Sequence, residues 1–284
     1  MGALTPRLEK VVHTLEWVRI EEYVGSTWIG VGRPPCERAW LANAFVAKAV
    51  LGLTTTVGLI ERLQMDRALR RICGFQLCRK LPSEATFSRA FEEFAERRLA
   101  ERVHEALVKE QLGDELIGHL SRDATAIIAR ERPTKPRAVA PASALQASLV
   151  PGEETAASAA APAPKKRGRP RRGEVRTPAK VSPIVRQRDQ SLAQMLAEIP
   201  TRCDHGSKCN AQGYKIGWNG YKLHLDTADC GVPISAVLSS ASMHDSRAAI
   251  PLSLISQARV TNLYDVMDAA YCSLELHEHC RSLG

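Results

Sequence analysis

The chain has 284 residues, which is enough for two domains of ordinary size. No apolar run reaches the about 18 residues of a membrane-spanning helix, and the N-terminus MGALTPRLEK lacks the apolar core of a signal peptide, so we expect a cytoplasmic protein without a membrane partner. The formal charge of +8 is concentrated in residues 165–188, which hold ten Lys or Arg and one acidic residue, Glu174. A basic block of this kind is typical of an arm that contacts a polyanion.

Residues 1–118 predict an all-helical domain. Apolar spacing indicates helices over 41–53 and 54–65, and a third over 67–75 that ends at Gly74. Residues 81–112 read as one long helix with an aromatic face. Its arginines fit either a solvated face or contacts with phosphates, and the sequence leaves both open. They are Arg89, Arg97, Arg98 and Arg102.

A strand follows in residues 119–132, with the sequence HLSRDATAII and Asp123 in its middle. Asp123 and Thr125 point to one face of this strand, and Ala124 and Ala126 point to the other. An aspartate in mid-strand is unfavourable by propensity. It is either a surface or strand-end residue, or it is retained because it binds a ligand.

Residues 133–186 predict a disordered linker, because Ala, Pro and Ser dominate and little apolar surface is available for burial. Within it, RGRP matches the core of an AT-hook, whose arginines enter the narrow minor groove of A·T-rich DNA. A generic basic tether is the alternative, and both would bind nucleic acid by neutralising phosphates. The candidate DNA-binding residues are Lys165, Lys166, Arg167, Gly168, Arg169, Pro170, Arg171 and Arg172.

Residues 187–284 alternate between predicted strands and helices. A short helix over 187–198 precedes a strand over 221–226, which pairs as a hairpin with 232–238 across a turn at 229–231. A helix that opens at 244–246 and a strand over 263–267 then predict a crossover to a parallel pair. Asp268 follows this strand at its carboxyl end, where open α/β sheets place ligands. We therefore interpret Asp123 and Asp268 as partners in one metal site.

The cysteines and histidines allow a zinc site as an alternative. The chain has eight cysteines and no CxxC pair, and neither of its two Cys/His clusters has the spacing of a zinc finger. Tyr221, His224 and His244 are lesser candidates for contacts with DNA or metal. The two clusters are Cys203, His205 and Cys209, and Cys272, His277, His279 and Cys280.

Three stretches resemble insertion-sequence transposases of the DDE class: GYKLHLDTADCGVPISAVLSSASMHDSRAAIPL, VTNLYDVMDAAY and SRDATAIIARERP. RRICGF and LPSEATFSRAFEEF resemble the helical domain that precedes their catalytic domain. The resemblance implies an α+β or α/β chain in which an N-terminal all-helical domain precedes an RNase H-like mixed sheet with crossover helices. Asp123 and Asp268 correspond to the first two acidic ligands of a Mg²⁺ (or Mn²⁺) pair.

The same resemblance implies double-stranded DNA, at the terminal inverted repeats of the element, as the partner, and a bacterial, nucleoid-associated location. A homodimer is also compatible with it. In the family the third ligand is a glutamate on a helix beyond a further strand, whereas Glu275 and Glu278 directly follow the second aspartate. We assign the third acidic ligand to no residue.

From this departure we expect an incomplete sheet and a truncated copy that does not cut DNA. Two other functions stay open. The chain is then either a DNA-binding regulator or repressor derived from a transposase, or a zinc-binding regulator.

Overall fold

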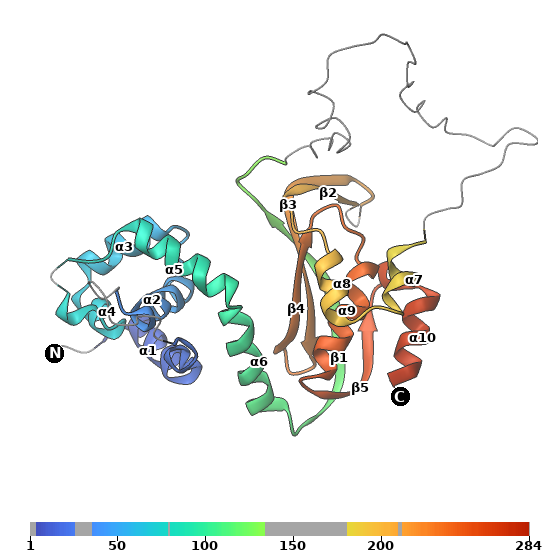
Figure 1. Ribbon diagram of the computed structural model, residues 1–284, viewed down its shortest axis with the longest axis horizontal. Helices are drawn as coiled ribbons and strands as arrows, with labels where there is room; N and C mark the ends of the chain where they lie inside the picture. The colour runs from blue at the N-terminus through green and yellow to red at the C-terminus, as the bar shows by residue number, and fades with distance from the viewer. Residues whose placement is uncertain (1–3, 26–35, 79, 134–180, 210–211, 284) are drawn as a thin grey trace, which may run out of the picture. The chain divides into compact units, whose positions relative to one another are not determined.

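The computed structural model describes residues 4–25, 36–78, 80–133, 181–209 and 212–283 (Figure 1). The chain divides into two compact units. One comprises Met1–Ile117 and Gln257–Leu263, and the other comprises Gly118–Ser256 and Tyr264–Gly284. A helical region followed by a mixed sheet is the fold class that the sequence predicts, and it is confirmed.

The first unit consists of helices around one apolar core. Its largest buried side chains include Phe75 and Phe87, and Phe87 makes an edge-on ring contact with Phe45 at 5.8 Å between centroids. Gly74 has φ 96°, and a Cβ there would lie 2.3 Å from Trp40 Cδ1, so the turn after α4 needs glycine. The helices are α1 (Pro6–Val18), α2 (Arg38–Val50), α3 (Thr56–Met65), α4 (Arg67–Ile72), α5 (Glu84–Glu96) and α6 (Leu99–Leu112), with 3-10 turns at Ile20–Tyr23 and Phe75–Leu77.

The single long helix predicted over 81–112 is wrong, because the segment forms α5 and α6 with a break at Arg98. Arg98 adopts a left-handed conformation with φ 50°, and its guanidinium binds Glu101 at the start of α6. The two helices bury their apolar residues in different clusters. Phe87 of α5 joins the main core, whereas Val103 of α6 joins a second cluster around Ile20. The partly buried Phe94, near the end of α5, packs against both clusters, so the break lies where the chain passes from one cluster to the other.

Five strands of the described chain form one sheet: β1 (Leu116–Ile128), β2 (Asp204–Cys209), β3 (Lys215–Ala228), β4 (Pro233–Ser240) and β5 (Thr261–Met267). β3 pairs antiparallel with β1, β2 and β4, and the predicted β3–β4 hairpin is confirmed. β2 was not predicted. The segment between β4 and β5 connects two strands that are not neighbours in the sheet. β4 pairs with β3, whereas β5 lies beside β1.

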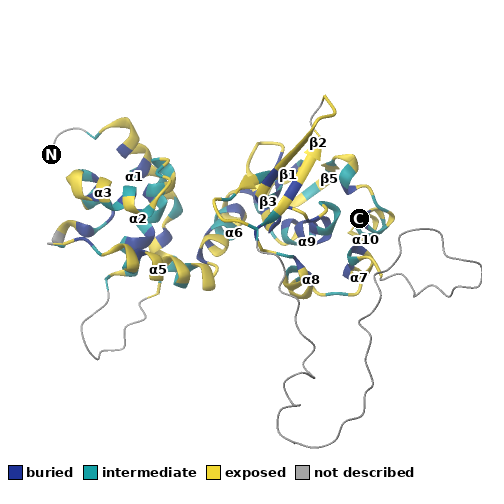
Figure 2. Cartoon of the chain, turned by 90° about the horizontal axis from the view of Figure 1, so that it is seen from above, coloured by how far each residue is buried: buried dark blue, intermediate teal, exposed yellow. Residues whose placement is uncertain are grey.

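Helices of the second unit pack on one face of this sheet. They are α7 (Pro183–Gln187), α8 (Leu192–Glu198), α9 (Ser246–Gln257) and α10 (Leu274–Leu283) (Figure 1). α9 is the most buried of them, with Ala248–Ser253 inaccessible, and Figure 2 shows its buried residues in dark blue. It packs through Leu252 and Ala248 on Val237 of β4. Pro251 lies inside this helix.

The predicted helix over 187–198 is two short helices, α7 and α8. Ser191 begins α8 with a capping box, in which its hydroxyl accepts from Gln194 N and the Gln194 side chain accepts from Ser191 N. This cap fixes the start of α8 and separates it from α7.

Within the described residues, the structure has no helix long and apolar enough to cross a membrane.

Candidate active site

Asp123 lies in the middle of β1 on the face of the sheet opposite to α9. The register places it opposite Leu225, and its neighbour Arg122 opposite Asp226. Because side chains alternate along a strand, Arg122 points under the helices and Asp123 points away from them. Asp123 is exposed, and its Oδ1 accepts a hydrogen bond from Ala124 N at 2.7 Å. The carboxylate of Asp123 is therefore oriented by the backbone of the next residue.

Asp268 lies directly after β5, the strand next to β1. Its carboxylate caps the short 3-10 helix Ala269–Tyr271, because Oδ1 accepts from Ala270 N at 3.0 Å. Asp268 is also exposed. Tyr264 and Val266, four and two residues earlier in β5, are exposed as well, which places Asp268 in phase with the face that carries Asp123. Both predicted carboxylates therefore lie on neighbouring strands and point to solvent.

The pKa of Tyr271 is affected by both predicted carboxylates, Asp123 and Asp268. Tyr271 is buried, and its hydroxyl has no hydrogen-bond partner among the described residues. Burial raises the pKa of Tyr271, and the negative charges of Asp245, Asp123 and Asp268 raise it further, while Arg122 lowers it. Three carboxylates from separate segments of the chain thus lie within electrostatic range of one phenol. Asp245 is the one that the sequence did not predict as a site residue.

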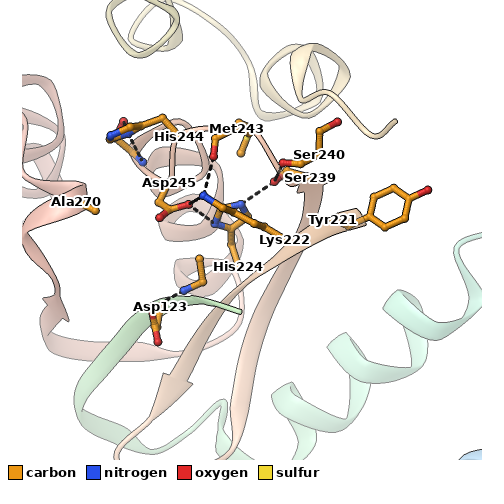
Figure 3. Close-up of polar contacts among 12 residues, drawn as sticks. Asp123, Tyr221, Lys222, His224, Ser239, Ser240, Met243, His244, Asp245 and Ala270 are labelled. Atoms are coloured by element: carbon orange, nitrogen blue, oxygen red, sulfur yellow. Dashed lines mark hydrogen bonds and ion pairs between the residues drawn. The ribbon is translucent and has the colours of Figure 1, made fainter. Parts of the chain in front are cut away.

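Asp245 is held by Lys222 from β3 (Figure 3). Lys222 Nζ donates to Asp245 Oδ1 at 2.8 Å and to the carbonyl oxygen of Met243 at 3.0 Å. His224, two residues along the same face of β3, has its Nδ1 3.9 Å from Asp245 Oδ1 and its Nε2 2.8 Å from Ser239 Oγ. The loop before α9 is therefore fixed to the sheet through one carboxylate.

The three lesser candidates have structural contacts. His224 is fully buried, and burial lowers its pKa to about 4, so it stays neutral in the core. The Tyr221 hydroxyl binds Glu131, and this bond raises the pKa of Tyr221 to about 12. His244 is exposed and its Nδ1 lies 2.8 Å from Ser246 Oγ at the start of α9. The ring of His224 lies close enough to Asp245 and Asp123 for their charges to oppose this effect of burial on its pKa.

Arg122 forms a buried ion pair beside the site. Its Nε and Nη2 bind the two carboxylate oxygens of Asp226 at 2.7 and 2.8 Å, and Nη2 lies 3.3 Å from Asp265 Oδ2 in β5. Burial alone would lower the pKa of the Arg122 guanidinium, but the bond to Asp226 and the charge of Asp265 raise it. Ser256 of α9 also donates to Asp226, at 2.7 Å. This charge network was not predicted, although Asp226 is a mid-strand aspartate like Asp123.

The chemistry of the two exposed carboxylates fits a hard divalent cation. In each, Oδ1 is oriented by a backbone N–H, and Oδ2 has no partner in the part of the chain that the structure describes. Mg²⁺ prefers oxygen ligands and retains several waters, so few protein ligands suffice. Groups of three or more His, Cys, Asp or Glu residues arranged to hold a metal are absent from the described residues. The assignment of Asp123 and Asp268 as metal ligands stays a prediction from the sequence.

The zinc alternative receives no support in the described residues. The second Cys/His cluster brings Cys272 Sγ within 3.7 Å of His277 Nε2 without assembling a larger ligand set. Cys203 is buried and donates to the carbonyl oxygen of Glu131 at 3.6 Å. The basic residues predicted to bind DNA, Lys165 to Arg172, lie outside the described residues.

Two family models match the chain. The model described as "Transposase domain (DUF772)" matches residues 4–93, and the model described as "Transposase DDE domain" matches residues 179–284. No curated protein and no solved structure matched the chain. The helical region and the sheet region are thus each a transposase domain, which defines a DNA transposase. The chain belongs to the DDE transposases of insertion sequences, as its motifs predicted.

Proposed function

We propose that this transposase binds double-stranded DNA at the terminal inverted repeats of its element and cleaves it with a divalent metal held by Asp123 and Asp268. The observation that carries this proposal is the position of the two carboxylates. Asp123 lies in β1 and Asp268 directly follows the neighbouring strand β5; both are exposed, and both raise the pKa of Tyr271. Mg²⁺ or Mn²⁺ bound there would activate water and stabilise the leaving oxygen of the phosphodiester.

The protein's own residues contribute orientation. The N–H groups of Ala124 and Ala270 each donate to one oxygen of a carboxylate, which leaves the other oxygen for a metal ion. A preformed pair of ligands reduces the ordering cost of metal binding. The basic arm, residues 165–188, holds ten Lys or Arg. Arg186 and Arg188 form ion pairs with Glu198 and Glu278, which leaves eight positive charges for contacts with phosphates. DNA binding by this arm would weaken steeply as salt concentration rises.

Cleavage of DNA that carries the terminal repeat tests the proposal. The proposal requires nicking in Mg²⁺ or Mn²⁺ by the full chain, which would overturn the inactivity that the sequence predicts. It also requires a loss of rate of about 100-fold or more in Asp123→Asn and in Asp268→Asn, the order seen when one charge-stabilising group is removed. Asp114→Asn is the matched control, because Asp114 is exposed and lies just before β1. Equal activity in all three variants would refute the site.

A DNA-binding regulator is the second function, and the basic arm favours it. Replacing Arg167 and Arg169 by alanine should weaken binding to A·T-rich DNA and reduce its salt dependence. Repeat-specific binding without any metal-dependent cleavage would support the regulator and contradict the nuclease. The two outcomes are separated by one gel in which bound and nicked DNA are resolved.

A further inference from the structure

The strands that carry Asp123 and Asp268 are tied together by a single guanidinium. Arg122 precedes Asp123 in β1, and Asp265 precedes Asp268 by three residues in β5. Arg122 Nη2 lies 3.3 Å from Asp265 Oδ2, while Nε and Nη2 bind Asp226 of β3 in a two-point contact. One side chain therefore connects β1 to both of its neighbours in the sheet, directly behind the exposed carboxylates.

The network of Arg122, Asp226 and Asp265 lies in the core, where charged groups lose free energy of hydration. Arg122 and Asp226 are 3% and 0% exposed, so both charges have lost their water. Arg122 Nη1 is buried and has no hydrogen-bond partner among the described residues. Buried ion pairs often stabilise a fold no better than apolar side chains of the same size would. The presence of charge here is thus not explained by stability alone.

The geometry of the Arg122 guanidinium determines which residues it can hold together. The guanidinium is a planar, rigid fork, and its two-point contact with Asp226 fixes the direction of its third contact, toward Asp265. Ser256 of α9 donates to Asp226 Oδ2 at 2.7 Å, and its hydroxyl lies 2.7 Å from Ser235 Oγ of β4. The fork is therefore itself held in place by the helix layer and by a further strand. One rigid side chain thus contacts both β3 and β5 from β1.

We propose that Arg122 is a positioning residue of the metal site, which sets the spacing between Asp123 and Asp268 by binding Asp226 and Asp265. This proposal rests on the proposed function of the two carboxylates. Loss of an outer partner of a metal ligand typically lowers metal affinity by about 10–100-fold. Misplacement of reacting groups by about 1 Å has a similar effect on rate.

The test separates position from stability. In the variant Arg122→Met/Asp226→Leu/Asp265→Asn, the network is replaced by neutral side chains of similar size. We expect its stability to urea to stay close to that of the natural protein, and its dissociation constant for Mn²⁺, measured by electron paramagnetic resonance of the free ion, to rise about 10–100-fold. The control Arg38→Met/Glu93→Leu removes a partly buried 2.7 Å pair from the helical unit and should leave Mn²⁺ affinity unchanged.

Arg122→Lys decides the question if the triple variant does not fold. Lysine keeps the positive charge but loses the fork, so Arg122→Lys should fold and still bind Mn²⁺ at least about tenfold more weakly. Natural Mn²⁺ affinity in a folded variant of either kind would overturn the positioning role. If the natural protein binds Mn²⁺ no better than Asp123→Asn does, the proposed metal site fails instead, and the two failures are distinguishable.

Discussion

His224 makes the stability of the sheet unit depend on pH. It is fully buried in β3 between Ser239, Lys222 and Asp245, and Asp123 also acts on it through space. Burial lowers the pKa of His224 from 6.5 to about 4, so the folded protein keeps the ring neutral. The unfolded chain protonates the same ring near pH 6.5. Protonation therefore favours unfolding throughout the interval between these two values.

The sign and size of this pH dependence follow from the number of protons that the folded and unfolded states bind. Between pH 6.5 and 4 the unfolded state binds more protons than the folded state, so the free energy of unfolding rises with pH in this window. Above pH 6.5 the contribution of His224 is constant. At 1.36 kcal/mol per pKa unit, the shift from 6.5 to about 4 corresponds to a loss of about 3 kcal/mol when the pH falls through the whole window.

The variant His224→Gln should remove this dependence, because glutamine can bond to Ser239 and does not titrate. Hydrogen exchange of peptides that cover β3, corrected for intrinsic exchange rates, gives the free energy of opening at each pH. The natural protein should lose about 3 kcal/mol more than His224→Gln between pH 6.5 and 4. His277→Gln, at an exposed histidine, is the control. Parallel curves for the natural protein and His224→Gln would refute the reasoning.

Three other substitutions test the fold. Gly220→Ala should cost about 3 kcal/mol in thermal denaturation, because its φ is 149° and a Cβ would lie 2.0 Å from a backbone oxygen of β1, whereas Gly231→Ala, with open space, should cost about 1 kcal/mol. Asp66→Ala removes the cap of α4 and should cost about 1 kcal/mol, seen as faster hydrogen exchange in that helix. Phe87→Ala should cost about 3–5 kcal/mol, and the control Phe91→Ala much less, because Phe91 is 59% exposed; equal losses would contradict the assigned core.

The two candidate carboxylates were predictable because each breaks a local rule. Asp123 lies in mid-strand, where aspartate is unfavourable, and Asp268 follows a strand at the end where ligands bind. Alternation along residues 221–226 also predicted β3 correctly. These are signals of short range, which periodicity and propensity can detect. The assignment of roles to the two residues stays a prediction.

The contacts around them were not predictable, because they depend on partners far apart in sequence. Alternation in β3 separates an apolar face from one with Lys222, His224 and Asp226, and the polar face is the one that α9 buries. Hydrophobicity alone suggests the opposite orientation. Burial of the Asp226 carboxylate depends on its hydrogen bonds from Arg122 and Ser256, which offset the loss of hydration. These partners are 104 and 30 residues away in the sequence. The break at Arg98 has the same origin in tertiary packing.

The adjacency of Arg122 and Asp123 also ties the register of the sheet to the site. Neighbouring residues of a strand face opposite sides, so a slip of β1 by one residue would bring Asp123 under α9 and turn Arg122 outward. Asp123 would then be buried against Asp226, two like charges without a cation, at a cost of several kcal/mol. The pairing seen, with Arg122 opposite Asp226, avoids this repulsion. The buried network therefore excludes the alternative register, and the exposed position of Asp123 is a consequence of where its neighbour finds its partner.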